Sequence, residues 1–102
     1  MSAIDLNILQ AVRESLAQLA RIAPGRAIEV RVPPYAAIQC GPGPTHTRGT
    51  PPNTVEMAAS IWLALANGSQ TWEKALAAGE IRASGLRADL SAWLPIENRM
   101  NQ

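Results

Sequence analysis

The chain has 102 residues, of which 47% are hydrophobic and 17% are charged, and these proportions fit one globular domain. Nine basic and eight acidic residues, interspersed along the chain, give a net charge of +1. This balance argues against general electrostatic binding to nucleic acid, so we expect no nucleic-acid partner. We expect a single domain over residues 1–102, in which residues 97–102 form a frayed tail.

Cys40 is the only cysteine, which excludes an intrachain disulfide and a cysteine-rich zinc site. Because no sequence neighbour favours its thiolate, we expect Cys40 to act as a small buried apolar residue. The single histidine does not complete a metal-ligand set, so we expect neither a metal nor another cofactor. The chain has no signal-like start and no run near the ~18 apolar residues of a membrane span, which predicts a cytoplasmic protein.

The first element is an amphipathic helix predicted from Asp5 to Ala23. Its apolar residues recur at steps of three and four, and polar residues occupy the opposite face. Ser2 or Asp5 can cap this helix, and Pro24-Gly25 ends it. Alternation of apolar and charged residues then predicts a strand from Ala27 to Val32 with one buried face.

Further strands are predicted in the middle of the chain. Tyr35 to Cys40 forms a hairpin with the preceding strand, after the interruption at Pro33-Pro34. Thr45 to Arg48 is predicted as a short third strand and Thr54 to Met57 as a fourth, each preceded by Gly and Pro residues. Because the connections are too short for crossovers, we expect these strands to be antiparallel.

Two short helices follow the strands. The first is predicted from Ser60 to Ala66, with Ser60 as the only nearby cap. The second is predicted from Trp72 to Ala78, capped by Thr71 and ended by Gly79.

The last elements complete a two-layer arrangement. Alternation predicts a strand from Glu80 to Ser84, and we expect Arg87 to Leu94 to make a closing helical turn before Pro95. This order predicts an α+β fold with two layers. Its mainly antiparallel sheet of about five strands is covered on one face by helices.

Three elements that each end in glycine mark the second half of the chain: Trp62 to Gly68, Trp72 to Gly79 and Ile81 to Gly85. The aromatic-Leu-Ala-Leu helix, the Ala-rich helix and the strand resemble the sterol carrier protein type 2 domain. The segments Ala23 to Arg26, Val30 to Cys40 and His46 to Asn53 resemble a small bacterial branch of that superfamily, the sterol carrier orthologues. The resemblance implies a helix, an antiparallel sheet of about five strands and further helices around an apolar tunnel. It implies a non-catalytic protein that binds or transports a lipid in this hydrophobic cavity.

A set of apolar residues is the candidate lining of a slot between the sheet and the helices: Leu16, Leu19, Ile38, Trp62, Leu65, Leu76, Leu90, Trp93 and Leu94. The same set could form a closed core, which suits a chain this short. If the closing helix acts as a lid, Trp93 and Leu94 become exposed when it opens and can touch a membrane transiently or a partner. The expected ligand is a fatty-acyl chain or another lipid.

His46 and Arg48 share one face if they lie on a strand, and they are candidates for contact with an anion or a protein partner. Their segment has no carboxylate to orient the histidine, so we expect no catalytic residues and no enzyme activity. The alternative to a carrier is a closed interaction or accessory module that uses residues 45–53 and lacks a tunnel. Similar domains accompany mycothiol-dependent isomerases, which gives a third hypothesis in which His46 and Arg48 orient a small acid.

Overall fold

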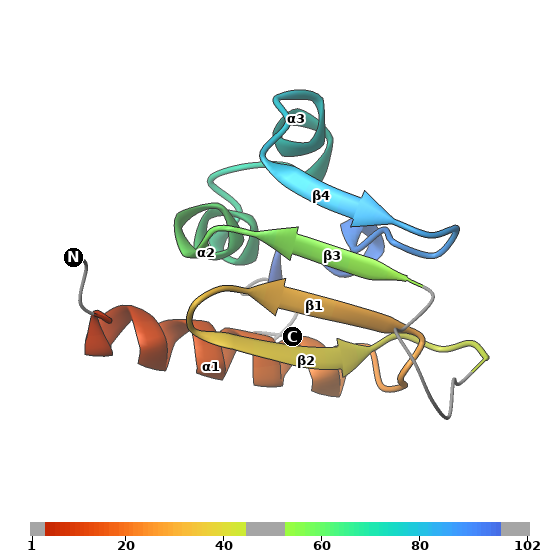
Figure 1. Ribbon diagram of the computed structural model, residues 1–102, viewed down its shortest axis with the longest axis horizontal. Coiled ribbons are helices and arrows are strands. Elements are labelled where there is room, and N and C mark those ends of the chain that lie inside the picture. Colours follow the sequence, from red (N-terminus) through yellow and green to blue (C-terminus); the bar gives the residue numbers. More distant parts are fainter. Residues whose placement is uncertain (1–3, 45–52, 97–102) are drawn as a thin grey trace.

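The computed structural model describes residues 4–44 and 53–96. Their elements are, in chain order, α1 (Leu6–Ile22), β1 (Ile28–Val32), β2 (Ala36–Cys40), β3 (Thr54–Met57), α2 (Ala59–Asn67), α3 (Trp72–Ala77), β4 (Ile81–Ser84) and the 3-10 turn η1 (Ser91–Trp93). Helix α1 lies behind β2, α3 lies beyond the β4 edge of the sheet, and the face of the sheet toward the viewer is open (Figure 1). The predicted α+β class is confirmed.

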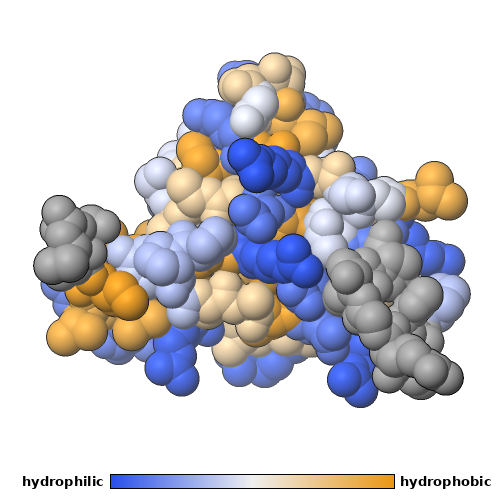
Figure 2. Space-filling model, viewed as in Figure 1, coloured by the Kyte–Doolittle hydropathy of each residue, from blue (hydrophilic) through white to orange (hydrophobic). Residues whose placement is uncertain are grey.

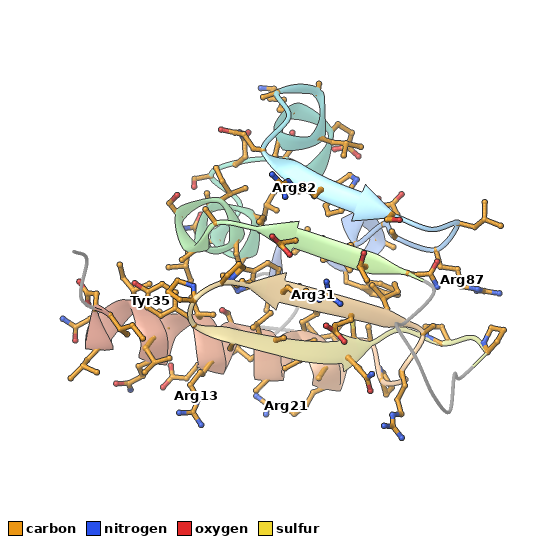
Figure 3. The ribbon with its side chains drawn as sticks, viewed as in Figure 1. Arg13, Arg21, Arg31, Tyr35, Arg82 and Arg87 are labelled. Atoms are coloured by element: carbon orange, nitrogen blue, oxygen red, sulfur yellow. The ribbon has the colours of Figure 1, made fainter. Side chains whose placement is uncertain are left out.

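Helix α1 forms where the apolar periodicity predicts it, and its start is set by Asp5. The Asp5 carboxylate accepts hydrogen bonds from the backbone N–H groups of Asn7 and Ile8, at 2.9 and 3.2 Å. These bonds satisfy two donors that lack a partner inside the helix. The apolar stripe is fully buried at Leu16 and Leu19, while Arg13 and Arg21 point away from the sheet (Figure 3).

The strand order in the sheet is β2-β1-β3-β4. Strands β1 and β2 are antiparallel, as are β3 and β4, but β1 and β3 are parallel. The prediction that all the front strands are antiparallel is therefore wrong for β1 and β3. Cys40 at the end of β2 and Thr54 at the start of β3 both lie beside the start of β1, opposite Ile28 and Glu29. Strand β2 thus ends and strand β3 begins at the same end of the sheet, on either side of β1, so the parallel pairing of β1 and β3 needs no crossover.

The described residues form four strands, so the prediction of about five is not confirmed. The predicted strand Thr45 to Arg48 lies outside them, as do residues 97–102, which we expected to fray. Two of the three pairings in the sheet are antiparallel, in agreement with a mainly antiparallel sheet.

Two predicted helix boundaries are wrong. Helix α2 begins at Ala59, and its N-cap residue is Ala58, which makes no side-chain capping bond. Ser60 therefore lies inside the helix and does not cap it. The predicted closing turn Arg87 to Leu94 is helical only at η1 (Ser91–Trp93). Proline at position 95 restricts Leu94 to an extended backbone, which prevents the turn from continuing.

Local capping confirms the predicted start of α3 and the glycine that ends α2. The Thr71 hydroxyl accepts a hydrogen bond from the Lys74 backbone N–H at 3.2 Å, so Thr71 caps α3. Gly68 ends α2 with a φ of 88°, in the left-handed region that favours glycine.

Charged side chains of opposite sign cover the open face of the sheet. In the register of the strands, Arg31 lies opposite Glu56, and Glu56 lies opposite Arg82. Arg31 also forms an ion pair with Glu29, whose hydrogen bond and negative charge raise the pKa of the arginine. Hydrophilic residues accordingly cross the centre of this face (Figure 2). Cross-strand pairs of opposite charge suit a face exposed to water.

Candidate ligand-binding site

Most of the predicted lining residues meet in one apolar core between the sheet and the helices. Those that are at most 1% exposed are Leu16, Leu19, Trp62, Leu65 and Leu90. Ile38, Trp93 and Leu94 are half-buried and pack against this core. Leu76 is 44% exposed on α3 and is not part of the core. The fold thus brings the set together except for Leu76, and it fills the space between the layers with their side chains.

Trp62 is the largest fully buried side chain, and it joins α2 to α1. Its indole Nε1 donates a hydrogen bond to the Ser15 hydroxyl oxygen at 2.7 Å. The Ser15 hydroxyl in turn donates toward the carbonyls of Ala11 and Val12, at 2.7 and 3.1 Å. The buried polar atoms are therefore satisfied, and the bond sets the position of α2 on α1. The role of Ser15 was not predicted, although this residue interrupts an otherwise apolar stripe.

A small hollow remains at the edge of this core, between α2, α3 and residues 91–95. Its volume is about 150 Å³. It is lined by Leu65, Gly68, Gln70, Thr71, Trp72, Glu73, Ser91, Leu94 and Pro95. A cavity of about 150 Å³ has room for a ligand the size of benzene, and the wall of this hollow is part apolar and part polar. The hollow therefore has room for the end of an acyl chain, and a longer chain requires that a neighbouring segment move.

A larger groove of about 410 Å³ lies between α1 and α2, and it is a poorer candidate. Glu14, Gln18 and Asn67 contribute polar groups to its wall. An apolar ligand there would cover these groups without replacing their bonds to water. The wall of the smaller hollow also has polar groups, from Gln70, Thr71, Glu73 and Ser91. It is the better site because Leu65 and Leu94 connect it to the apolar core.

Residues 88–96, called here the cap segment, cover the core beside this hollow. The blue ribbon that follows β4 passes behind the sheet, on the side of the helices (Figure 1). Leu90 and Ile96 are 0% exposed and attach the segment to the core, while Trp93 and Leu94 between them are half-buried. Apart from the single turn η1, residues 88–95 contain neither helix nor strand, and Ile96 is helical. Segments of this kind open more easily than sheets and long helices do.

A buried asparagine holds the chain just before the cap segment. Asn53 is 5% exposed, and its Nδ2 donates to the Ala27 carbonyl at 2.9 Å. Its Oδ1 accepts from the Arg87 backbone N–H at 2.9 Å, and its own carbonyl accepts from the Glu29 N–H at 2.9 Å. Asn53 thus ties the start of β1 to the residue that precedes the cap segment. This role was not predicted, and the one sign of it in the sequence is the position of Asn53 between a predicted turn and a predicted strand.

Comparison with known families agrees with this arrangement of elements. Residues 6–96 match the family described as "Bacterial SCP ortholog", where SCP denotes sterol carrier protein. The chain belongs to the bacterial sterol carrier protein orthologues. The resemblance found in the sequence is therefore confirmed. A search of curated proteins found no match.

Two predicted contact residues of this sterol carrier orthologue, His46 and Arg48, lie outside the described residues. Their contact with an anion or partner therefore stays a prediction. Within residues 4–44 and 53–96, no three His, Cys, Asp or Glu side chains are grouped so that they could hold a metal ion. No helix in the same ranges combines the length and the apolar character that are needed to cross a bilayer.

The buried thiol of Cys40 leads to a prediction about pH. Burial raises the pKa of Cys40 from 9.0 to about 11. Because the folded pKa exceeds the unfolded one, the stability linked to this thiol is complete below about pH 9 and is lost as the pH rises through about 11. We expect the free energy of unfolding, measured with urea, to fall more steeply over this range in the wild-type protein than in Cys40→Ala. Equal slopes for the two proteins would contradict the prediction.

Proposed function

We propose that this sterol carrier orthologue is a non-catalytic carrier that binds an apolar ligand, with the chemistry of a fatty-acyl chain, under the cap segment. The observation that carries the proposal is the hollow of about 150 Å³ beside Leu65 and Leu94. Leu65 and Leu94 connect the hollow to the apolar core, so that displacement of the cap segment would lengthen it. The family of the chain supports the same function.

The energetics favour a ligand that enters by one end. Each CH₂ group that leaves water contributes about 0.8 kcal/mol, so a few carbons in the hollow supply a modest affinity. A longer chain gains more by replacing contacts of Leu90 and Leu94 as the cap segment moves outward. That movement would also expose Trp93. We therefore propose that Trp93 and Leu94 contact a membrane transiently. We also propose that the protein is located in the cytoplasm.

Filling the hollow tests this site directly. Ser91 lines the hollow, and we expect Ser91→Trp to occupy it and to weaken binding of cis-parinaric acid about tenfold or more. Ser60→Trp is the matched control, because Ser60 is exposed on α2 and does not line the hollow. The dissociation constants come from the fluorescence of the probe and from its displacement by palmitic acid. Equal affinity of the two variants would place the ligand elsewhere.

Native mass spectrometry of protein purified from its host tests the function as a whole. We expect a copurified lipid, and we expect palmitic acid to raise the melting temperature because it binds the folded state. If no lipid copurifies and neither fatty acids nor acyl-CoA change the melting temperature or the tryptophan fluorescence, the carrier proposal fails. That result would favour the closed interaction or accessory module that uses residues 45–53.

A further inference from the structure

We infer that Asn53 is a positioning residue that holds the cap segment closed and so sets how fast an apolar ligand enters and leaves. The effect on closure follows from the contacts of Asn53 alone. The effect on ligand exchange rests on the proposed function.

The contacts of Asn53 connect two parts of the chain that are far apart in sequence. The Nδ2 bond to the Ala27 carbonyl and the bond from Glu29 N–H hold Asn53 on β1, which lies in the middle of the sheet. The Oδ1 atom then holds the Arg87 backbone N–H. The side chain is therefore a rigid bridge from the sheet to the start of the cap segment, and both ends of its carboxamide are used.

The position of Arg87 makes this bridge suitable as an anchor. Leu86, just before it, is fully exposed, whereas Ala88 and Leu90, just after it, are buried. The chain thus enters the core at the residue whose N–H bonds to Asn53. The Arg87 side chain also lies close to Gly43 in the loop after β2. A Cβ atom added to Gly43 would lie 3.1 Å from Arg87 Nε. Figure 3 shows Arg87 at this end of the sheet.

Loss of the anchor should loosen the cap segment more than the rest of the fold. A typical intramolecular hydrogen bond corresponds to a factor of about five to ten in an equilibrium constant. We therefore expect Asn53→Ala to increase amide hydrogen exchange in residues 88–94 about five- to tenfold relative to β1. Asn53→Asp keeps the acceptor for Arg87 N–H, but its second carboxylate oxygen faces the Ala27 carbonyl oxygen in place of the amide donor. It should therefore loosen the contact with Ala27 and open the cap segment less than Asn53→Ala does.

Ser15→Ala is the control for general destabilisation, because it removes a buried hydrogen bond between α1 and α2 without touching Asn53 or Arg87. Hydrogen exchange measured by mass spectrometry needs no ligand. The inference is overturned if Asn53→Ala speeds exchange equally in β1 and in the cap segment, or leaves the cap segment unchanged. It is also overturned if Asn53→Asp opens the cap segment as much as Asn53→Ala does.

Dissociation of cis-parinaric acid tests the effect on ligand exchange. We expect the probe to leave Asn53→Ala about five- to tenfold faster than it leaves the wild-type protein, and to leave Ser15→Ala at the wild-type rate. An unchanged rate in an Asn53→Ala protein whose cap segment exchanges faster would overturn this half of the inference. If the probe binds none of the proteins, the proposed function fails, and the hydrogen-exchange result still decides whether Asn53 anchors the cap segment.

Discussion

Gly25→Ala is expected to cost the protein more than about 3 kcal/mol of stability, or to prevent folding. Gly25 has a φ of +137°, and a Cβ atom there would lie 1.9 Å from the carbonyl oxygen of Gly41. The blocking atom belongs to the backbone of Gly41, and hydrogen bonds fix the position of this residue. Gly41 N–H donates to the Ala23 carbonyl at 2.8 Å, and Gly41 oxygen accepts from Ala27 N–H at 3.2 Å. The chain cannot relieve the clash without separating the end of α1 from the end of β2.

Gly79→Ala measures the cost of a left-handed backbone conformation in the absence of a steric clash. Gly79 also has a positive φ, of +76°, but a Cβ atom there meets nothing within 4 Å. Its substitution should therefore cost only the strain of the left-handed conformation, about 1 kcal/mol. Urea unfolding of the two variants gives the comparison. If Gly25→Ala is no less stable than Gly79→Ala, the close approach of Gly25 to Gly41 does not exist in the folded protein.

Trp62→Ala should lower the free energy of unfolding by about 3–5 kcal/mol, the usual range for removing a large aromatic side chain from a core. Trp62 is 0% exposed and packs where α2 meets α1. Its removal leaves a cavity, and it also deprives the Ser15 hydroxyl of the indole donor. Thermal or urea unfolding measures the loss. A cost below about 1 kcal/mol would show that the two helices do not pack through this ring.

Trp62→Phe and Ser15→Ala together separate the contribution of the hydrogen bond to stability from that of packing. Trp62→Phe retains an aromatic ring in the core but cannot donate to Ser15. A double-mutant cycle with Ser15→Ala should give a coupling free energy of about 1 kcal/mol, as expected for one buried hydrogen bond. Additive effects of the two substitutions would mean that the bond contributes nothing to stability.

The sequence was sufficient for features that depend on neighbouring residues. Periodicity predicted α1 from Asp5 onward with Ser2 or Asp5 as its cap, because helix contacts and caps join residues at most four apart. The structure shows that Asp5 is the cap. Gly68 and Thr71 were recognised for the same reason. The motifs that end in glycine also indicated the family. By contrast, Ser60 was predicted as a cap from its residue type, although Ala58 holds that position without a side-chain bond.

The candidate site could be predicted only in part. The apolar residues of α1, α2 and the cap segment were expected to lie together, since their faces must be buried in a chain with a single core, and they pack in one cluster. Their role as the lining of a ligand site stays a prediction. Leu76 was assigned to the same cluster, but α3 leaves it 44% exposed. Apolar character predicts that a residue is buried, but it does not show which element covers that residue. Asn53 escaped prediction because its partners, Ala27 and Arg87, lie in distant parts of the chain.

The sequence by itself determined the class of the fold, most of its elements and which residues avoid water. Only the tertiary structure decided that β3 pairs with β1 in parallel, and that the space between the layers is filled by Trp62 and its neighbours apart from a small hollow. The physical reason is that periodicity records which face of an element is buried. The choice of pairing partner and the volume left between side chains depend on contacts between segments that are far apart along the chain.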